Sequence, residues 1–286
     1  MHLFMILSAL SLVWLCRTYG YRWLKAKRNQ WTWAKRWQGN LLVFLWSPLL
    51  LLMTAIAVLW MGPQGHMVWV QEGWWSYGLA IGFVGMAVGL NLRLIIEGWA
   101  SLQRIHACPQ TQIQGHWAYQ VDHVLPYAAQ VGFWQSELVI TQGLLQTLSA
   151  EQLTSVLVHE QAHQQYRDTF WFFWWGWLRR LTDWLPHSTE LWQELLLLRE
   201  LRADQWAAQQ VDPLVLAESL LLMVNPSPAD FSESICAAMQ TATGHRLSER
   251  IDALLAPSET ALPAYSWTWS GLLVTAAPLL TIPFHY

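Results

Sequence analysis

Long apolar runs flank a more polar middle section, and they give the first outline of the chain. Residues 41–61, LLVFLWSPLLLLMTAIAVLWM, carry no charge and are long enough to cross a bilayer core of about 30 Å as a helix. Residues 74–92 and 264–284 form two further runs. Residues 3–16 fall short of the roughly 17 residues usually needed, so they are the weakest of about four predicted transmembrane helices.

The middle section carries helical and β-type patterns. Ser149 and Gln152 have the spacing of a capping box, which predicts a helix over about 150–166, and a second long helix is predicted over about 188–210. Residues 131–145 contain β-rich stretches around a turn-like QSE, which predicts a hairpin in a small sheet. The fold class is therefore an α-helical integral membrane protein with an inserted α+β, mainly helical, domain.

Composition and charge support a membrane protein and suggest its orientation. The chain is 54% hydrophobic and only 12% charged, against about 25% charged residues in soluble domains. Residues 17–36 contain seven Lys or Arg and no acid, whereas residues 62–73 contain neither Lys nor Arg, which places the first segment in the cytoplasm and the N-terminus outside. Anchoring to anionic lipid explains the basic segment better than nucleic-acid binding does, so no direct nucleic-acid partner is expected.

These runs divide the chain into a membrane region, a cytoplasmic domain and a final helix. Three scattered cysteines lack metal-like spacing and predict reduced thiols in an inner-membrane protein. The predicted membrane region is residues 1–105, with helices at about 3–16, 41–61 and 74–92 and a basic cytoplasmic loop at 17–40. The predicted cytoplasmic domain follows at residues 106–258. Residues 259–286 are predicted to form a linker and the last transmembrane helix.

The stretch VLVHEQAHQQYRD carries the strongest candidate chemistry. His159 and His163 lie one helical turn apart, so their imidazoles can share one metal ion. Glu160 is placed to act on a water molecule at that metal and is predicted as the catalytic base. The alternative, a polar helix that happens to carry two histidines, is disfavoured because this motif seldom occurs by chance.

A catalytic zinc site needs a third protein ligand, and LLLLRELRADQWAAQ offers one. Glu200 and Asp204 share one face of the second predicted helix. Glu200 is predicted as the third zinc ligand, and Asp204 is predicted to accept the second ring N–H of a ligating histidine. An ordinary solvated acidic face beside Arg199 and Arg202 is the competing interpretation.

With these motifs in place, the chain resembles the BlaR/MecR-type membrane metallopeptidases. The resemblance rests on SAEQLTSVLVHEQAHQQYRD and RELRAD, and more weakly on HRLSERIDALL, residues 245–255. It implies a zincin-type (gluzincin) protease domain with His159, His163 and Glu200 on Zn²⁺. It also implies site-specific cleavage of a cytoplasmic BlaI/MecI-like transcriptional repressor. Asp168 matches a family position too, and we expect it to end the helix and bond to nearby backbone.

Other interpretations stay open. The sequence lacks the extracellular penicillin-binding sensor of the best-known members, so direct β-lactam sensing is not expected. An HtpX-like quality-control protease is an alternative, although that group has a membrane hairpin between its two motifs, where this chain has only FWFFWWGW, residues 170–177, interpreted as an interfacial helix. A catalytically inactive scaffold or receptor is disfavoured by the intact Glu160. The oxyanion donor is open among Tyr166, His187 and His245.

Overall fold

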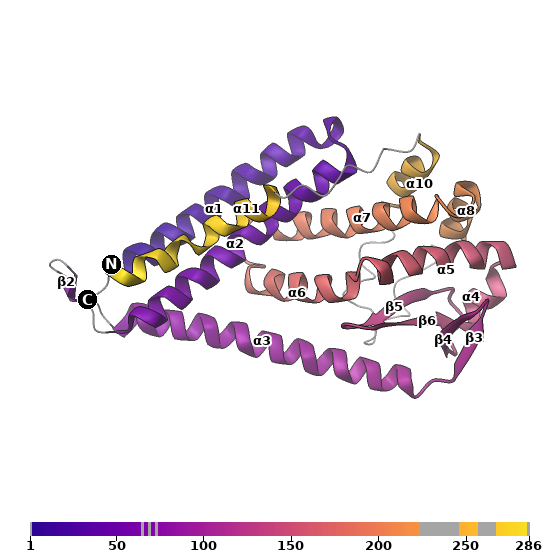
Figure 1. Ribbon diagram of the computed structural model, residues 1–286, viewed down its shortest axis with the longest axis horizontal. Coiled ribbons are helices and arrows are strands. Elements are labelled where there is room, and N and C mark those ends of the chain that lie inside the picture. The colour runs from indigo at the N-terminus through magenta and orange to yellow at the C-terminus, as the bar shows by residue number, and fades with distance from the viewer. Residues whose placement is uncertain are drawn as a thin grey trace. The chain divides into compact units, whose positions relative to one another are not determined.

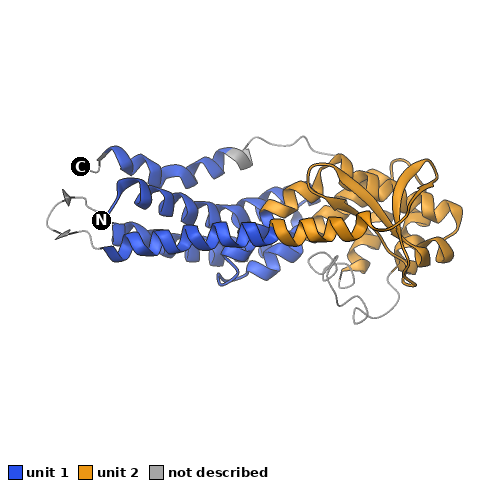
Figure 2. Ribbon diagram, turned by 90° about the horizontal axis from the view of Figure 1, so that it is seen from below, with its two compact units in different colours: residues 1–94, 175–195, 261–286 blue, residues 95–174, 196–260 orange. Residues whose placement is uncertain are grey.

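The computed structural model shows a mostly helical chain with a small sheet (Figure 1). It describes residues 2–63, 66–67, 70–71, 74–223, 246–256 and 267–284. By packing, the chain divides into two compact units, coloured separately in Figure 2: unit 1 comprises residues 1–94, 175–195 and 261–286, and unit 2 comprises residues 95–174 and 196–260. Helices α3, α6 and α7 have residues in both units.

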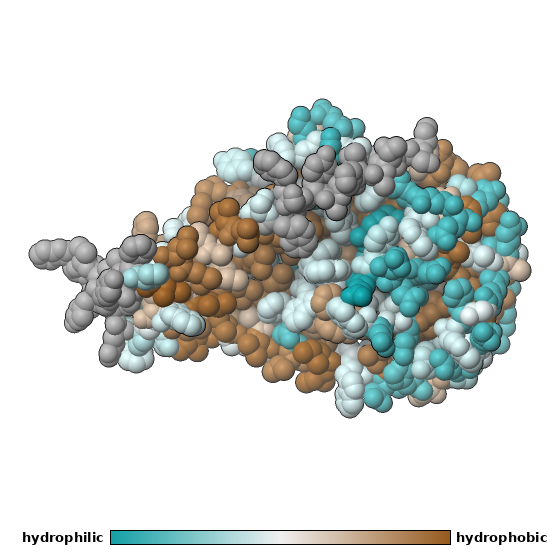
Figure 3. All heavy atoms as spheres, in the orientation of Figure 1, coloured by the Kyte–Doolittle hydropathy of each residue, from teal (hydrophilic) through white to brown (hydrophobic). Residues whose placement is uncertain are grey.

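Unit 1 holds long apolar helices. Helices α1 (His2–Lys27), α2 (Trp33–Met61) and α3 (Trp74–His106) are each long and apolar enough to cross a membrane. Figure 3 shows hydrophobic side chains gathered over this part of the molecule. Strands β1 (His66–Met67) and β2 (Val70–Gln71) form an antiparallel pair between α2 and α3. These features indicate membrane association.

The structure differs from the predicted helix limits at the N-terminal end. The predicted helix at 3–16 extends to Lys27 as α1, and α2 already begins at Trp33. The segment 17–40 is therefore helical apart from the 3₁₀ turn η1 (Arg28–Gln30) and the two residues after it, rather than a loop. Arg17 ends the apolar pattern in the sequence, but its buried side chain donates to Ser47 and to the Phe44 carbonyl of α2, so the helix continues through it.

The last predicted transmembrane helix is described from residue 267 onward. Its first part is α11 (Trp267–Leu273) and its second part is the 3₁₀ segment η3 (Val274–Phe284), and both pack against α2. Pro278 and Pro283 lack an N–H group, which weakens regular helix geometry here. The predicted linker and the first residues of the predicted span 264–284 lie outside the described residues. A fourth transmembrane span therefore stays a prediction.

Residues 175–195 belong to unit 1, although the sequence placed them in the cytoplasmic domain. They join the end of α6 (Asp168–Leu181) to the start of α7 (Ser188–Ala207). Their aromatic rings explain the placement: Trp175 lies 5.7 Å from Trp37, and Trp192 lies 5.8 Å from Phe44, between ring centroids. Leu185 packs in a buried cluster with residues of α1 and α2. The aromatic run is thus partly a buried helix.

Unit 2 contains a four-stranded sheet in the order β3-β4-β6-β5. Strands β3 and β4 pair antiparallel, β4 and β6 parallel, and β6 and β5 antiparallel. A hairpin is present as β5 and β6, but it begins before the predicted stretch 131–145, and residues 133–135 connect the strands instead of the predicted QSE turn, whose serine and glutamate belong to β6. The strand bounds are β3 Gln110–Ile113, β4 His116–Val121, β5 Ala128–Gly132 and β6 Ser136–Thr141.

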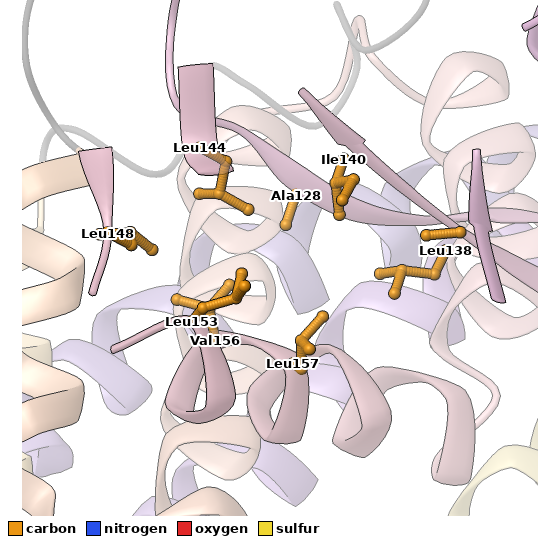
Figure 4. Packing of buried hydrophobic residues seen from close by; sticks show 9 residues of the cluster. Ala128, Leu138, Ile140, Leu144, Leu148, Leu153, Val156 and Leu157 are labelled. Atoms are coloured by element: carbon orange, nitrogen blue, oxygen red, sulfur yellow. The ribbon is translucent and has the colours of Figure 1, made fainter. Parts of the chain in front are cut away.

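One face of helix α5 (Ala150–Gln165) packs against this sheet. Leu153, Val156 and Leu157 meet Leu138 and Ile140 of β6 in a buried apolar cluster, shown in Figure 4. The capping box predicted at the start of α5 is present, because its serine and glutamine side chains each bond to the other's backbone. Besides α5 and its parts of α3, α6 and α7, unit 2 contains three short helices among the described residues: α4 (Gln142–Thr147), α8 (Pro213–Met223) and α10 (Leu247–Leu255).

Candidate metal centre

Helix α5 brings the HEQAH motif beside the sheet. Successive residues turn by about 100°, so Glu160 continues the row of Val156 and Leu157 and points toward the sheet side of the helix. His159 and His163 share a neighbouring face, and their rings lie 4.9 Å apart between centroids. All three motif residues are buried, with between 6% and 8% of each exposed.

Helix α7 supplies the third group. The Nε2 atoms of His159 and His163 lie 3.2 Å apart, and Oε2 of Glu200 lies 3.4 Å from the first and 3.8 Å from the second. Among the residues that the structure describes, these three alone form a group able to hold a metal ion. Glu200 and Asp204 are both buried, so the solvated acidic face considered for this helix is not what the structure shows.

The three residues fit a catalytic zinc ion. Two ligand atoms at about 2.0–2.1 Å from a tetrahedral zinc lie about 3.3 Å apart, close to the observed separations. Two imidazoles and one carboxylate form a donor set of the catalytic type, which leaves a fourth position for water or substrate. The geometry therefore suits a metal such as zinc without rearrangement of the two helices.

Each histidine has a carboxylate at its other ring nitrogen. Nδ1 of His163 lies 2.8 Å from Oδ2 of Asp168, the first residue of α6, in a buried hydrogen bond. Nδ1 of His159 lies 2.9 Å from Oδ1 of Asp204, although the N–H direction departs from that of a well-aligned hydrogen bond. These partners favour a proton on Nδ1 and leave Nε2 free to face the metal position.

Three arginines neutralise the carboxylates. Arg250, from α10, donates two hydrogen bonds of 2.7 Å to Asp204 and approaches Oε2 of Glu200 at 3.4 Å. Arg199 donates to Oε1 of Glu200 at 2.6 Å. Arg202 donates to Asp168. Arg250 contacts both oxygens of Asp204, and Glu200 has Arg199 at Oε1 and Arg250 at Oε2. These contacts fix the directions in which the carboxylates face the histidines.

The electrostatics favour positive charge at the metal position. Burial lowers the pKa of His159, but Asp204 and Glu200 raise it by more, to about 9. Burial raises the pKa of Glu200, but Arg199 and His163 hold it well below its ordinary value. The carboxylates thus stay ionised and stabilise a cation between the ligand atoms.

Sequence reasoning missed the contacts that come from distant parts of the chain. Asp168 was expected to bond to nearby backbone, but its carboxylate accepts a hydrogen bond from the ring of His163. Arg250 gave no signal beyond its place in HRLSERIDALL. Of the candidate oxyanion donors, Tyr166 lies under the guanidinium of Arg202, at 4.1 Å. His187 belongs to unit 1 and stacks on Tyr21, and His245 is outside the described residues.

Comparison with known proteins agrees with this site. The family model Peptidase family M48 matches residues 101–174, about a quarter of the chain. No curated protein and no solved structure matches the chain. The matched segment includes His159, Glu160 and His163 but neither Glu200 nor Asp204, which only the fold brings to the site. The match indicates a metal-dependent peptidase and does not distinguish the BlaR/MecR type.

Proposed function

We propose that this protein is a membrane-anchored zinc endopeptidase. The observation that carries the proposal is the convergence of His159 Nε2, His163 Nε2 and Glu200 Oε2 within 4.8 Å of one another, beside the buried Glu160. Helices able to span a membrane belong to the same chain, which supports an enzyme that acts at a membrane surface. We place the zinc domain on the cytoplasmic side of the inner membrane, by the distribution of basic residues.

The residues of the site have separate tasks in peptide hydrolysis. A zinc ion held by the three ligands would supply a Lewis acid that activates water and polarises the scissile carbonyl. Glu160 takes the proton of the attacking water and passes it to the leaving amine. Asp168 and Asp204 keep the ligating imidazoles neutral at Nε2 and correctly turned. The buried setting of Glu160 limits competing solvent contacts during the transfer.

The sheet provides a place for the peptide. Strand β5 is an edge strand on the side of the sheet that contacts α5, and no described strand pairs with its outer edge. An extended peptide can therefore add to β5 through backbone hydrogen bonds, with its scissile bond at Glu160.

Metal and activity measurements on matched variants test the proposal. The full chain, purified in lipid nanodiscs, should contain one zinc per molecule by mass spectrometry and cleave casein. His163→Ala should lose the zinc, whereas Glu160→Gln should retain it and lose about 10²–10⁴-fold in cleavage rate, because only the proton transfer is removed. Stoichiometric zinc in His163→Ala, or normal cleavage by Glu160→Gln, would refute the proposed roles.

For the substrate, the sequence resemblance supports one candidate, a cytoplasmic repressor of the BlaI/MecI type. A site held at a membrane surface suits a single regulated cut better than bulk digestion. This candidate rests on the HEQAH and RELRAD segments and on the proposed cytoplasmic orientation.

A specific observation favours a second candidate, membrane proteins handled in quality control. The HtpX-like group was disfavoured because only an aromatic run lies between the two motifs. Residues 175–195, which join α6 to α7 between those motifs, in fact pack with α1 and α2 in unit 1. This arrangement is similar to the inter-motif membrane hairpin of that group.

A further inference from the structure

Gln130, on the edge strand β5, is a buried polar side chain without a clear structural role. Only 8% of the residue is exposed, and its Oε1 atom has no hydrogen-bond partner among the described residues. A buried amide oxygen without a donor costs free energy, so native proteins seldom keep one without a ligand or another compensation. The metal centre does not use this residue, and none of the motifs includes it.

The register of the sheet shows where this side chain points. Gln130 pairs with Leu138, and Ala128 pairs with Ile140, without a bulge between them. Ala128, Leu138 and Ile140 all belong to the apolar cluster between the sheet and α5, as Figure 4 shows. Because side chains alternate along a strand, Gln130 lies on the same face as Ala128, toward α5.

The two ends of β5 place Gln130 next to the HEQAH turn. At the start of the strand, Ala128 packs in the cluster with Leu157 of α5. Just beyond its end, the carbonyl of Phe133 accepts a hydrogen bond from Thr169 at the start of α6, and the Phe133 ring packs on Phe170. The strand thus runs from the middle of α5 toward its C-terminal end, and Gln130 lies between these two contacts.

Glu160 reaches the same space from the helix. It continues the sheet-facing row of α5 one turn beyond Leu157, so it points toward β5 as Gln130 points toward α5. A peptide that lies along the free edge of β5 with its scissile bond at Glu160 must pass Gln130.

We propose that Gln130 is a substrate-positioning residue, whose side-chain amide accepts a hydrogen bond from an N–H group of the bound peptide next to the scissile bond. This inference rests on the proposed peptidase function and deepens it by naming a recognition contact. The site then selects an extended peptide with a free N–H at that position, and it disfavours proline there, because proline has no N–H group.

Binding of a small peptide probe tests the contact without turnover. The probe is a hydroxamate joined to Leu-Phe-amide, and the comparison compound is acetohydroxamate, which has the same zinc-binding group and no peptide. Both are titrated by calorimetry into the zinc-loaded full chain in nanodiscs. Gln130→Met keeps a similar volume without the hydrogen bond, and Gln112→Leu, on the opposite edge strand β3, is the matched control.

The expected result distinguishes a loss of peptide binding from a loss of the folded metal site. In Gln130→Met, zinc content and acetohydroxamate affinity should stay at the wild-type level, while the Kd of the peptide hydroxamate rises about tenfold, as expected for one lost hydrogen bond. Gln112→Leu should change neither affinity. Wild-type affinity for the peptide hydroxamate in Gln130→Met would overturn the proposal.

Modified probes make the same test in the wild-type chain. N-methylation of each probe amide in turn should weaken binding at one position, and that loss should vanish in Gln130→Met. Equal losses in both proteins would overturn the assignment of Gln130 as the acceptor. If the wild-type chain instead binds neither zinc nor acetohydroxamate, the proposed function fails, a result distinct from loss of the Gln130 contact alone.

Discussion

Asp168 connects the metal position to the beginning of α6. Its carboxylate accepts from Nδ1 of His163 with one oxygen and from Arg202 with the other, and 3% of the residue is exposed. Burial raises the pKa of Asp168, but the contacts with His163 and Arg202 lower it by more, so the group is held ionised. An ionised partner increases the basicity of the imidazole and fixes its ring, which would favour metal binding by His163.

From this arrangement we expect Asp168→Asn to weaken zinc binding by about 10- to 100-fold while the chain stays folded. The asparagine has a similar shape but carries no charge to complement the imidazole or Arg202. Competition with a fluorescent zinc chelator measures the affinity, and Asp252→Asn, at an exposed position on α10, is the matched control. Equal zinc affinity in Asp168→Asn and the wild type would show that the contact does not tune the metal.

Residue spacing indicated some members of this candidate centre but gave no sign of others. His159 and His163 could be assigned because one helical turn fixes their geometry locally. Glu200 needed only the further assumption that a second helix faces the first. Arg250 and Asp168 could not be assigned, because their partners depend on how α10 and the start of α6 fold back onto the site, which no local pattern encodes.

Among the elements, α2 contains a proline whose effect is compensated by α1. Pro48 lacks the N–H that would bond to the carbonyl of Phe44, one turn earlier. Arg17 of α1 donates to that carbonyl at 3.3 Å, and its guanidinium also reaches Ser47 at 3.1 Å and Thr182 at 3.4 Å. Within a bilayer such freed carbonyls need a donor from a neighbouring helix.

A double-mutant cycle tests this compensation. Arg17→Met should lower the free energy of unfolding by about 1–3 kcal/mol, since the Phe44 carbonyl loses its donor. In the background of Pro48→Ala the loss should shrink, because residue 48 then supplies its own N–H. Thermal unfolding of the full chain in detergent measures both, with the exposed Arg22→Met as control. A more stable Arg17→Met variant would mean that desolvation of the guanidinium outweighs its hydrogen bonds.

The elements that the sequence predicted well are those that depend on local interactions. The capping box of α5 is confirmed, because serine capping acts within a few positions. The hairpin of β5 and β6 is present, but its turn lies at 133–135 and not at the predicted QSE. The length of α1 was underestimated, since a charged residue ends an apolar run unless a neighbouring helix satisfies it. The packing of residues 175–195 with α1 and α2 depended on aromatic partners more than a hundred residues away.

For the whole molecule, the basic residues at the end of α1 and the start of α2 predict the orientation in the membrane. Cysteine labelling in a chain without its native cysteines measures it. With the N-terminus outside, a cysteine at Pro63, just after α2, should react with an impermeant maleimide in intact cells. A cysteine at the exposed Glu151, in unit 2, should react only after the membrane is opened. The opposite labelling pattern would reverse the orientation and place unit 2 outside.

The two candidate substrates, a BlaI/MecI-like repressor and membrane proteins, differ in which uncut protein the cell would accumulate. Cells with Glu160→Gln in place of the wild type should build up uncut substrate, because the zinc-loaded site still binds peptides but cannot hydrolyse them. Enrichment of new protein N-termini, compared between the two strains, identifies the cut. A BlaI/MecI-like repressor co-expressed with each form is followed in parallel by immunoblot.

The packing of residues 175–195 with α1 and α2 leads us to expect the cuts in membrane proteins, near the ends of their transmembrane segments. A peptide reaching the edge of β5 must be extended and unpaired. Misfolded membrane proteins expose such segments at the membrane surface, whereas a folded repressor exposes them only in a linker. Repressor cleavage by the wild type but not by Glu160→Gln, with no change among membrane proteins, would instead establish the regulatory role.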